Sequence, residues 1–211
     1  MEKNTEKQAW DHAAGLYQDT FGAMSLYDDT YDGLCKEFTI AGPSVLEIGC
    51  GPGMITRKIL ERVPSARILG LDYSQEMIAI ARKLNPDARF EVRDAEHIGA
   101  FDQRFDAVVC GFVIPYLSEN GLNAMIASVY ENLTTKGIFY LSFVEGDPSA
   151  SGPVKNSLGD TVVFRYYETQ SLVDRISASG FHLLREWKIR YEKKDATFEN
   201  HVVLIFKKQA D

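Results

Sequence analysis

The sequence of 211 residues contains few cysteines, and their spacing excludes two common kinds of stabilising site. The chain has three cysteines, Cys35, Cys50 and Cys110, which is an odd number. No two of them lie at C-x-x-C spacing. Disulfide frameworks need more cysteines, and zinc sites usually need them in closely spaced pairs. The sequence therefore predicts neither a disulfide framework nor a metal site.

Long apolar segments are also absent from the sequence. No run of about eighteen apolar residues, the length that crosses a bilayer, occurs in it. The first seven residues, MEKNTEK, are polar and lack the apolar centre of a signal peptide. We therefore expect a cytoplasmic protein without a membrane partner.

A surplus of positive charge is missing as well. The formal net charge is −7 and the isoelectric point is about 5.2. Lys193-Lys194 and Lys207-Lys208 are isolated pairs rather than parts of a basic cluster. Because domains that bind nucleic acids usually carry a basic face, the composition argues against a nucleic acid as partner.

The sequence does contain enough apolar residues for one sizeable domain. Hydrophobic residues make up 45% of it and charged residues 25%, which is typical of a globular protein. Apolar periodicity predicts strands over 45–48, 67–72, 89–92, 105–110, 137–144, 161–166, 181–191 and 201–206. It predicts helices around 10–17, 29–39, 55–63, 75–84 and 122–133, and a short helix between Thr169, as its N-cap, and Gly180. The last two strands are expected to form an antiparallel pair.

The most informative segment is Val45–Gly53, with the sequence VLEIGCGPG. A buried strand is followed by three alternating glycines, and Ile55, Ile59 and Val63 then recur at helical spacing. An ordinary turn between a strand and a helix needs fewer glycines. Glycine permits positive φ and a close approach of the backbone, so this loop is predicted to contact a bound molecule.

Two details of this loop bear on the chemistry of the ligand. A dinucleotide site has the pattern G-x-G-x-x-G, and Met54 stands where the third glycine of that pattern belongs. Glu47 precedes the loop, and its carboxylate is a poor neighbour for a pyrophosphate but a good one for a cation. A cationic ligand is therefore favoured over a dinucleotide.

The pattern resembles motif I of the class I S-adenosylmethionine-dependent methyltransferases, E-x-G-x-G-x-G, which Glu47, Gly49, Gly51 and Gly53 fill in order. The methyl donor of that family, S-adenosylmethionine, carries a positive sulfonium and an α-amino group. The resemblance implies an α/β, Rossmann-like, doubly wound fold with a mostly parallel seven-stranded sheet and an antiparallel last strand. It also implies a helical N-terminal lid at residues 1–40 and a methyltransferase domain at 41–211, within a single domain overall.

Carboxylates after the next two strands complete the expected cofactor site. Asp72 ends a strand about twenty positions beyond the glycine loop, where an acidic residue accepts hydrogen bonds from ribose hydroxyls. In the resembling family, Asp94 and the N–H of Ala95 correspond to the groups that bind adenine, and a bulky residue such as Tyr73 covers the nucleoside. The cofactor-binding residues carried over are Glu47, Gly49, Gly51, Asp72, Tyr73, Asp94, Ala95 and Cys110.

The acceptor site is less well marked in the sequence. Residues 110–113, CGFV, replace the N-P-P-Y motif typical of methyltransferases that act on nucleobase nitrogens, and no aspartate follows that would bind magnesium. Pro115 and Tyr116 stand where many small-molecule members have a histidine pair. Tyr17 and Tyr116 are candidates for contact with the acceptor, as are Tyr27 and Tyr31. Packing is an equal alternative for Tyr116, and it is the commoner role for the other three tyrosines. The loop 145–153 is the expected place for specificity to vary.

These patterns together predict an enzyme that transfers a methyl group from S-adenosylmethionine to a small-molecule acceptor by in-line displacement. No catalytic residue is assigned, because His12, Tyr17, Tyr116 and Glu145 are all conceivable bases. A sensor or scaffold that binds S-adenosylmethionine or S-adenosylhomocysteine without turnover is the first alternative, and a nicotinamide dehydrogenase the second. The acceptor, the methylated atom and the oligomeric state stay open.

Overall fold

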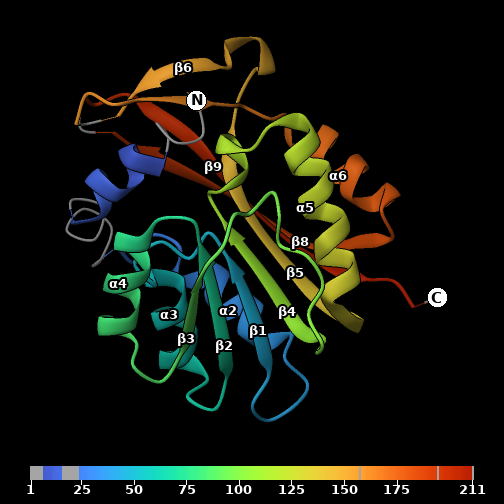
Figure 1. Ribbon diagram of the computed structural model, residues 1–211. Helices are drawn as coiled ribbons and strands as arrows, with labels where there is room; N and C mark the ends of the chain where they lie inside the picture. The colour runs from blue at the N-terminus through green and yellow to red at the C-terminus, as the bar shows by residue number, and fades with distance from the viewer. Residues whose placement is uncertain (1–6, 16–23, 157, 194, 211) are drawn as a thin grey trace.

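The computed structural model describes residues 7–15, 24–156, 158–193 and 195–210. A seven-stranded sheet forms its centre (Figure 1). The strand order is β3 (Arg89–Val92), β2 (Arg67–Asp72), β1 (Ser44–Ile48), β4 (Phe105–Gly111), β5 (Leu133–Glu145), β9 (Phe198–Lys208) and β8 (Phe181–Glu192). The first five strands are parallel, and β9 runs antiparallel to both of its neighbours. The predicted fold class is therefore confirmed, including the antiparallel last strand.

Helices cover both faces of this sheet. On one face, α2 (Asp28–Lys36) and α3 (Met54–Arg62) bury Leu34 and Ile59 against one set of strand side chains. On the other face, α5 (Glu119–Asn132) and α6 (Thr169–Ala178) pack on the alternate set. The helix α4 (Gln75–Leu84) packs on β3 through Ile78, Ala81 and Phe90. Because both faces are covered, the central strands are apolar on both sides, as the sequence indicated.

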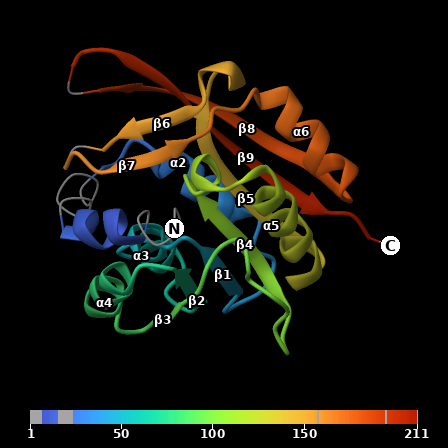
Figure 2. The ribbon, with the colours of Figure 1, turned by 45° about the horizontal axis from the view of Figure 1, so that its top comes forward.

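A hairpin of two short strands stands apart from this sheet. The strands β6 (Gly152–Lys155) and β7 (Thr161–Phe164) pair antiparallel and project beyond the end of β5 (Figure 2). The sequence predicted a loop over 145–153 and an extended segment over 161–166, and it did not predict that these segments pair. Residues 7–15 are helical and lie beside the hairpin, where the His12 Nδ1 and Asp160 Oδ2 atoms are 3.1 Å apart.

Some predicted boundaries differ from the observed ones. The helix expected over 29–39 ends at Lys36, and β5 begins at Leu133 rather than at 137. Thr169 is the first residue of α6 and not its N-cap, which is Glu168. The Thr169 hydroxyl instead donates a hydrogen bond to the Glu145 carboxylate at 2.5 Å, so a tertiary contact replaces the expected cap.

None of the helices in the described part of the chain has both the length and the apolarity that a membrane span requires.

Candidate active site

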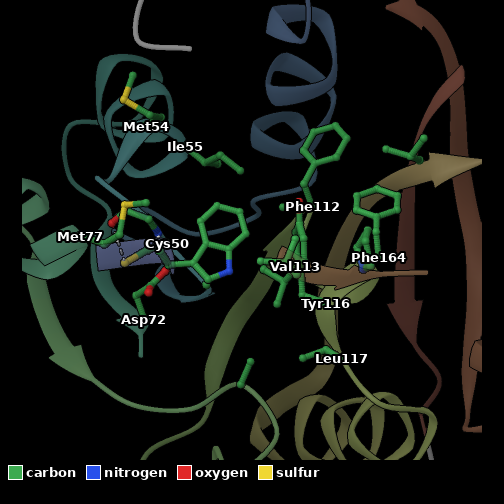
Figure 3. A pocket seen from close by; sticks show the side chains of 18 of the residues that line it. Cys50, Met54, Ile55, Asp72, Met77, Phe112, Val113, Tyr116, Leu117 and Phe164 are labelled. Carbon is green, nitrogen blue, oxygen red and sulfur yellow. Dashed lines mark hydrogen bonds between the residues drawn. The ribbon is translucent and has the colours of Figure 1, made fainter. Parts of the chain in front are cut away.

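A cavity of about 520 Å³ lies at the carboxyl ends of β1, β2 and β4. The strand order reverses between β1 and β4, and ligands of doubly wound sheets bind where such a reversal occurs. Figure 3 shows Cys50, Asp72 and Met77 on one side of the cavity, and Phe112, Tyr116 and Phe164 on the other. The cavity therefore has one half beside the glycine loop and another beside the end of β4.

The glycine loop presents bare backbone to this cavity. Gly49, Gly51 and Gly53 all have positive φ, at 63°, 52° and 80°. A Cβ atom on Gly49 would lie 2.2 Å from the Val113 Cγ2 atom, whereas one on Gly51 would meet nothing closer than the Met77 sulfur at 3.9 Å. The loop thus needs glycine for its conformation and, at Gly49, also for packing. Gly49 and Gly51 both line the cavity.

Glu47 is a buried carboxyl group in the wall beneath the loop. Its residue is 1% exposed, and its Oε2 atom accepts a hydrogen bond from the Thr56 hydroxyl. The Oε1 atom is buried and has no hydrogen-bond partner in the described part of the chain. Burial raises the Glu47 pKa to about 8. A cationic group in the cavity would satisfy Oε1 and favour the ionised form.

Asp72 connects the end of β2 with the glycine loop. Its Oδ2 atom accepts a hydrogen bond from the Gly51 N–H at 2.9 Å, and its Oδ1 atom accepts one from the Ser74 N–H at 2.9 Å. Burial raises the Asp72 pKa to about 6, although these hydrogen bonds oppose the rise. Asp72 is therefore mostly ionised at neutral pH, with both of its oxygens fixed at the cavity wall. Tyr73 follows it and also lines the cavity.

Asp94 and Ala95 lie in the same wall, after β3. The Asp94 Oδ1 atom accepts a hydrogen bond from the Glu96 N–H at 2.9 Å, which fixes the turn. The His97 Nδ1 atom lies 3.3 Å from the Asp94 Oδ2 atom. Three segments that follow three different strands therefore meet around one cavity.

Seven of the eight residues predicted to bind the cofactor line this cavity: Glu47, Gly49, Gly51, Asp72, Tyr73, Asp94 and Ala95. Cys110 does not. Its side chain is completely buried in the apolar core on the α5 side of the sheet, and burial raises its pKa to about 12. The next residue, Gly111, lines the cavity in its place. Successive residues of a strand face opposite sides of the sheet, which explains the error.

Of the predicted acceptor contacts, Tyr116 lines the half of the cavity beside the end of β4. Its ring lies edge-on to those of Trp10 and Phe164, with centroids 4.9 and 5.4 Å away. Tyr27 and Tyr31 also line the cavity, and Tyr17 falls outside the described residues.

The other two bases considered do not line the cavity. The His12 ring lies against Asp160 of the hairpin loop. The Glu145 carboxylate binds Thr169, and its Oε1 atom is also 3.4 Å from the Lys188 ammonium.

Several lining residues were missed at the sequence level. The most important is His201, which reaches the cavity together with Tyr191 and Glu199 from the outer strands. Because β9 is antiparallel to β5, its first residues lie at the carboxyl ends of the parallel strands. The predicted direction of this last strand was therefore a signal that could have placed His201 near the site.

Within the residues that the structure describes, no group of three or more histidine, cysteine, aspartate or glutamate side chains is arranged to hold a metal ion.

Comparison with known proteins shows similarity to methyltransferases. Residues 45–137 match the family described as "Methyltransferase domain", which confirms the resemblance indicated by the glycine loop. The malonyl-[acyl-carrier protein] O-methyltransferase of Bacillus cytotoxicus is 30% identical over 100 residues, which are 46% of this chain and 34% of that protein. The trans-aconitate 2-methyltransferase of Variovorax paradoxus is 31% identical over 94 residues, or 44% and 36% of the two chains. The matched segments thus span about a third of these relatives.

Among solved structures, a similar fold occurs in the 1,6-didemethyltoxoflavin-N1-methyltransferase of Burkholderia thailandensis. That protein holds 1,6-didemethyltoxoflavin and S-adenosylhomocysteine. The two folds superpose with a TM-score of 0.75 at 16% identity, covering 99% of this chain and 89% of the other. At this identity the likeness supports the fold.

Proposed function

We propose that the protein transfers a methyl group from S-adenosylmethionine to a small molecule, and the match of residues 45–137 to the methyltransferase-domain family supports this. The observation that carries this proposal is the meeting of the glycine loop, Glu47, Asp72 and Asp94 around one cavity. One relative is named as a malonyl-[acyl-carrier protein] O-methyltransferase and the other as a trans-aconitate 2-methyltransferase, so carboxylic acids belong in the panel of acceptors to be tried.

The residues present fit the methyl donor. The unpartnered Glu47 Oε1 atom is placed to accept a hydrogen bond from an α-amino group, and the bare backbone at Gly51 leaves room for the amino-acid portion. Asp72 would bind the ribose hydroxyls, with Tyr73 covering the nucleoside. Asp94 would accept from the adenine amine, and the Ala95 N–H would donate to the adjacent ring nitrogen. When bound, the donor supplies a methyl group on a positively charged sulfur that leaves as a neutral thioether.

The chain's own contribution is to orient the reactants and to exclude water. Holding two reactants in the reacting geometry can contribute roughly 7–11 kcal/mol to the lowering of the barrier. In this proposal the N-terminal residues 1–40 form a lid over the domain at 41–211 and exclude water from the site. In support, residues 7–15 contact the start of α4 and the acceptor half of the cavity: the Ser74 hydroxyl donates to the Asp11 carboxylate at 2.5 Å, and Trp10 packs on Tyr116.

The acceptor is assigned to the half of the cavity beside the end of β4. Phe112, Tyr116 and Phe164 line this half, and their rings favour a planar or apolar acceptor. Tyr116 is proposed as an acceptor contact, and so is Tyr17, which lies outside the described residues.

Calorimetry with S-adenosylhomocysteine tests the cofactor assignment, with NAD⁺ as the matched control ligand. Binding of the first and not of the second supports the proposal, and the reverse result would overturn it in favour of a dehydrogenase. Transfer of a labelled methyl group from S-adenosylmethionine to a panel of carboxylic acids, phenols and amines then tests catalysis. Tight binding without transfer to any acceptor would favour the sensor instead.

A further inference from the structure

One side chain from the N-terminal part of the chain meets two from β9 in the cavity wall beside the end of β4. Tyr27 immediately precedes α2, and Glu199 and His201 lie on β9. The Tyr27 hydroxyl oxygen is 2.6 Å from the His201 Nδ1 atom, and the His201 Nε2 atom is 3.4 Å from the Glu199 Oε2 atom. All three residues line the cavity. They form a continuous hydrogen-bonded series from the cavity surface to a carboxylate.

The chemistry of the three groups fixes the direction of these hydrogen bonds. An ionised carboxylate only accepts, so the His201 Nε2 atom carries the proton and donates it to Glu199. The His201 Nδ1 atom is then a bare acceptor, and the Tyr27 hydroxyl donates to it. The hydrogen bond from His201 and the ammonium of Lys193, whose Nζ atom is 3.1 Å from Glu199 Oε1, both lower the Glu199 pKa. Glu199 is therefore held ionised, ready to stabilise a positive charge on His201.

The position of the series places it beside the acceptor half of the cavity. His201 and Tyr27 are only 6% and 8% exposed. The His201 ring stacks on that of Tyr191 with centroids 4.6 Å apart, and the Phe112 ring lies 4.9 Å from it. Phe112 directly follows β4 and has a positive φ of 56°, which turns the chain away from the strand at this point. The groups expected to hold the cofactor lie at or just after the carboxyl ends of β1, β2 and β3 instead.

We propose that Tyr27 is a catalytic residue that removes a proton from the acceptor, with His201 and Glu199 acting through it as a relay. This inference rests on the proposed methyl transfer. The acceptor oxygen or nitrogen forms a bond to the methyl carbon as the carbon–sulfur bond of the donor breaks, with its electron pair staying on sulfur. The acceptor proton moves to the Tyr27 oxygen while the Tyr27 proton moves to the His201 Nδ1 atom. The imidazolium formed is paired with Glu199 and later releases its proton to water.

The relay defines the class of acceptor that this site serves. An acceptor that is already ionised, such as a carboxylate at neutral pH, has no proton to lose and needs no relay. A phenol or a ring N–H is weakly acidic and planar, which suits both the relay and the aromatic wall formed by Phe112, Tyr116 and Phe164. The site is thus assigned to a planar acceptor with a weakly acidic O–H or N–H.

A coloured phenol tests this inference without knowledge of the natural acceptor. The probe is 4-nitrophenol, whose anion absorbs at longer wavelength than its neutral form, added to protein saturated with S-adenosylhomocysteine. At a pH below the probe's own pKa in water, we expect binding to raise the anion fraction. Tyr27→Phe and His201→Asn should lose this increase while keeping the affinity for S-adenosylhomocysteine.

Controls separate the relay from a structural role of these residues. Tyr167→Phe also removes the hydroxyl of a buried tyrosine, one that donates to the Ile114 carbonyl oxygen at 3.3 Å outside the cavity, and it should behave as the unaltered protein does. Should the two buried variants fail to fold, Glu199→Gln provides the test, because Glu199 is partly exposed and its replacement should leave the fold intact. We expect bound 4-nitrophenol to have a smaller anion fraction in this variant than in the unaltered protein. The relay would be overturned if none of the variants at Tyr27, His201 and Glu199 lowers the anion fraction of the probe. It would also be overturned if the probe does not bind. Failure of S-adenosylhomocysteine itself to bind would overturn the proposed function instead.

Discussion

The Asp72 carboxylate accepts a hydrogen bond from the Gly51 N–H at 2.9 Å, which ties the end of β2 to the glycine loop that follows β1. One side chain thus holds the loop in shape and faces the cavity where the ribose is proposed to bind. A change at Asp72 is therefore expected to affect both the shape of the loop and the binding of the ribose.

The first prediction concerns the loop and compares two glycines of similar conformation. Gly49 and Gly99 have φ values of 63° and 71°, so alanine at either position is expected to cost about 1–2 kcal/mol of stability. Only at Gly49 would the new Cβ atom also collide with a neighbour, Val113, because nothing lies within 4 Å of the position at Gly99. Calorimetry should show that Gly49→Ala abolishes binding of S-adenosylhomocysteine and that Gly99→Ala keeps it. Equal affinities in the two variants would count against the loop as the binding element.

The second prediction concerns stability and pH. Burial raises the Glu47 pKa from 4.5 to about 8, so the folded protein holds a proton that the unfolded chain has lost between these values. Because the folded state binds more protons, this carboxyl group makes stability fall as pH rises from about 4.5 to about 8. At about 1.4 kcal/mol per pKa unit, the total effect is on the order of a few kcal/mol. Thermal unfolding of Glu47→Gln should show a stability gain that is larger at pH 8.5 than at pH 5. A gain that does not depend on pH would contradict a buried, neutral Glu47.

The third prediction follows from the same group. At pH 7 Glu47 is mostly protonated in the free protein, and a bound α-ammonium group would lower its pKa. Binding of S-adenosylhomocysteine should therefore release up to one proton. Titration calorimetry in two buffers of different ionisation enthalpy measures this release, which Glu47→Gln should abolish. Binding without proton release by the unaltered protein would show that Glu47 does not meet the amino group.

The fourth prediction uses the two tryptophans of the chain. Trp10 lines the cavity, whereas Trp187 packs against Gly33 outside it. Trp187→Phe should keep a fluorescence change on addition of S-adenosylhomocysteine, and Trp10→Phe should lose it. A signal that persists in Trp10→Phe would place the helical segment 7–15 away from the bound nucleoside.

The sequence predicted those parts of the site whose signals are local. The strand, the glycine loop and the helix after it are contiguous, and Asp72 is marked by its place at the end of an apolar run. Cys110 was misplaced because β4 is apolar on both faces, so its sequence does not tell which side chains face the cavity. The hairpin of β6 and β7 was missed because its strands have four residues each and only one buried side chain between them, Val162, which leaves little alternation. His201 was missed because its position depends on the pairing of β9 with β5, a contact between distant segments.

The central claim is that the glycine loop and two carboxylates bind an adenosyl amino acid in this cavity. The most direct test is the affinity of Asp72→Ala/Asp94→Ala for S-adenosylhomocysteine, measured by calorimetry on protein whose folding is verified by circular dichroism. Hydrogen bonds to charged groups contribute about 1.5–3 kcal/mol each, so we expect the affinity to fall by at least about a hundredfold. An unchanged affinity in the folded double variant would contradict the account.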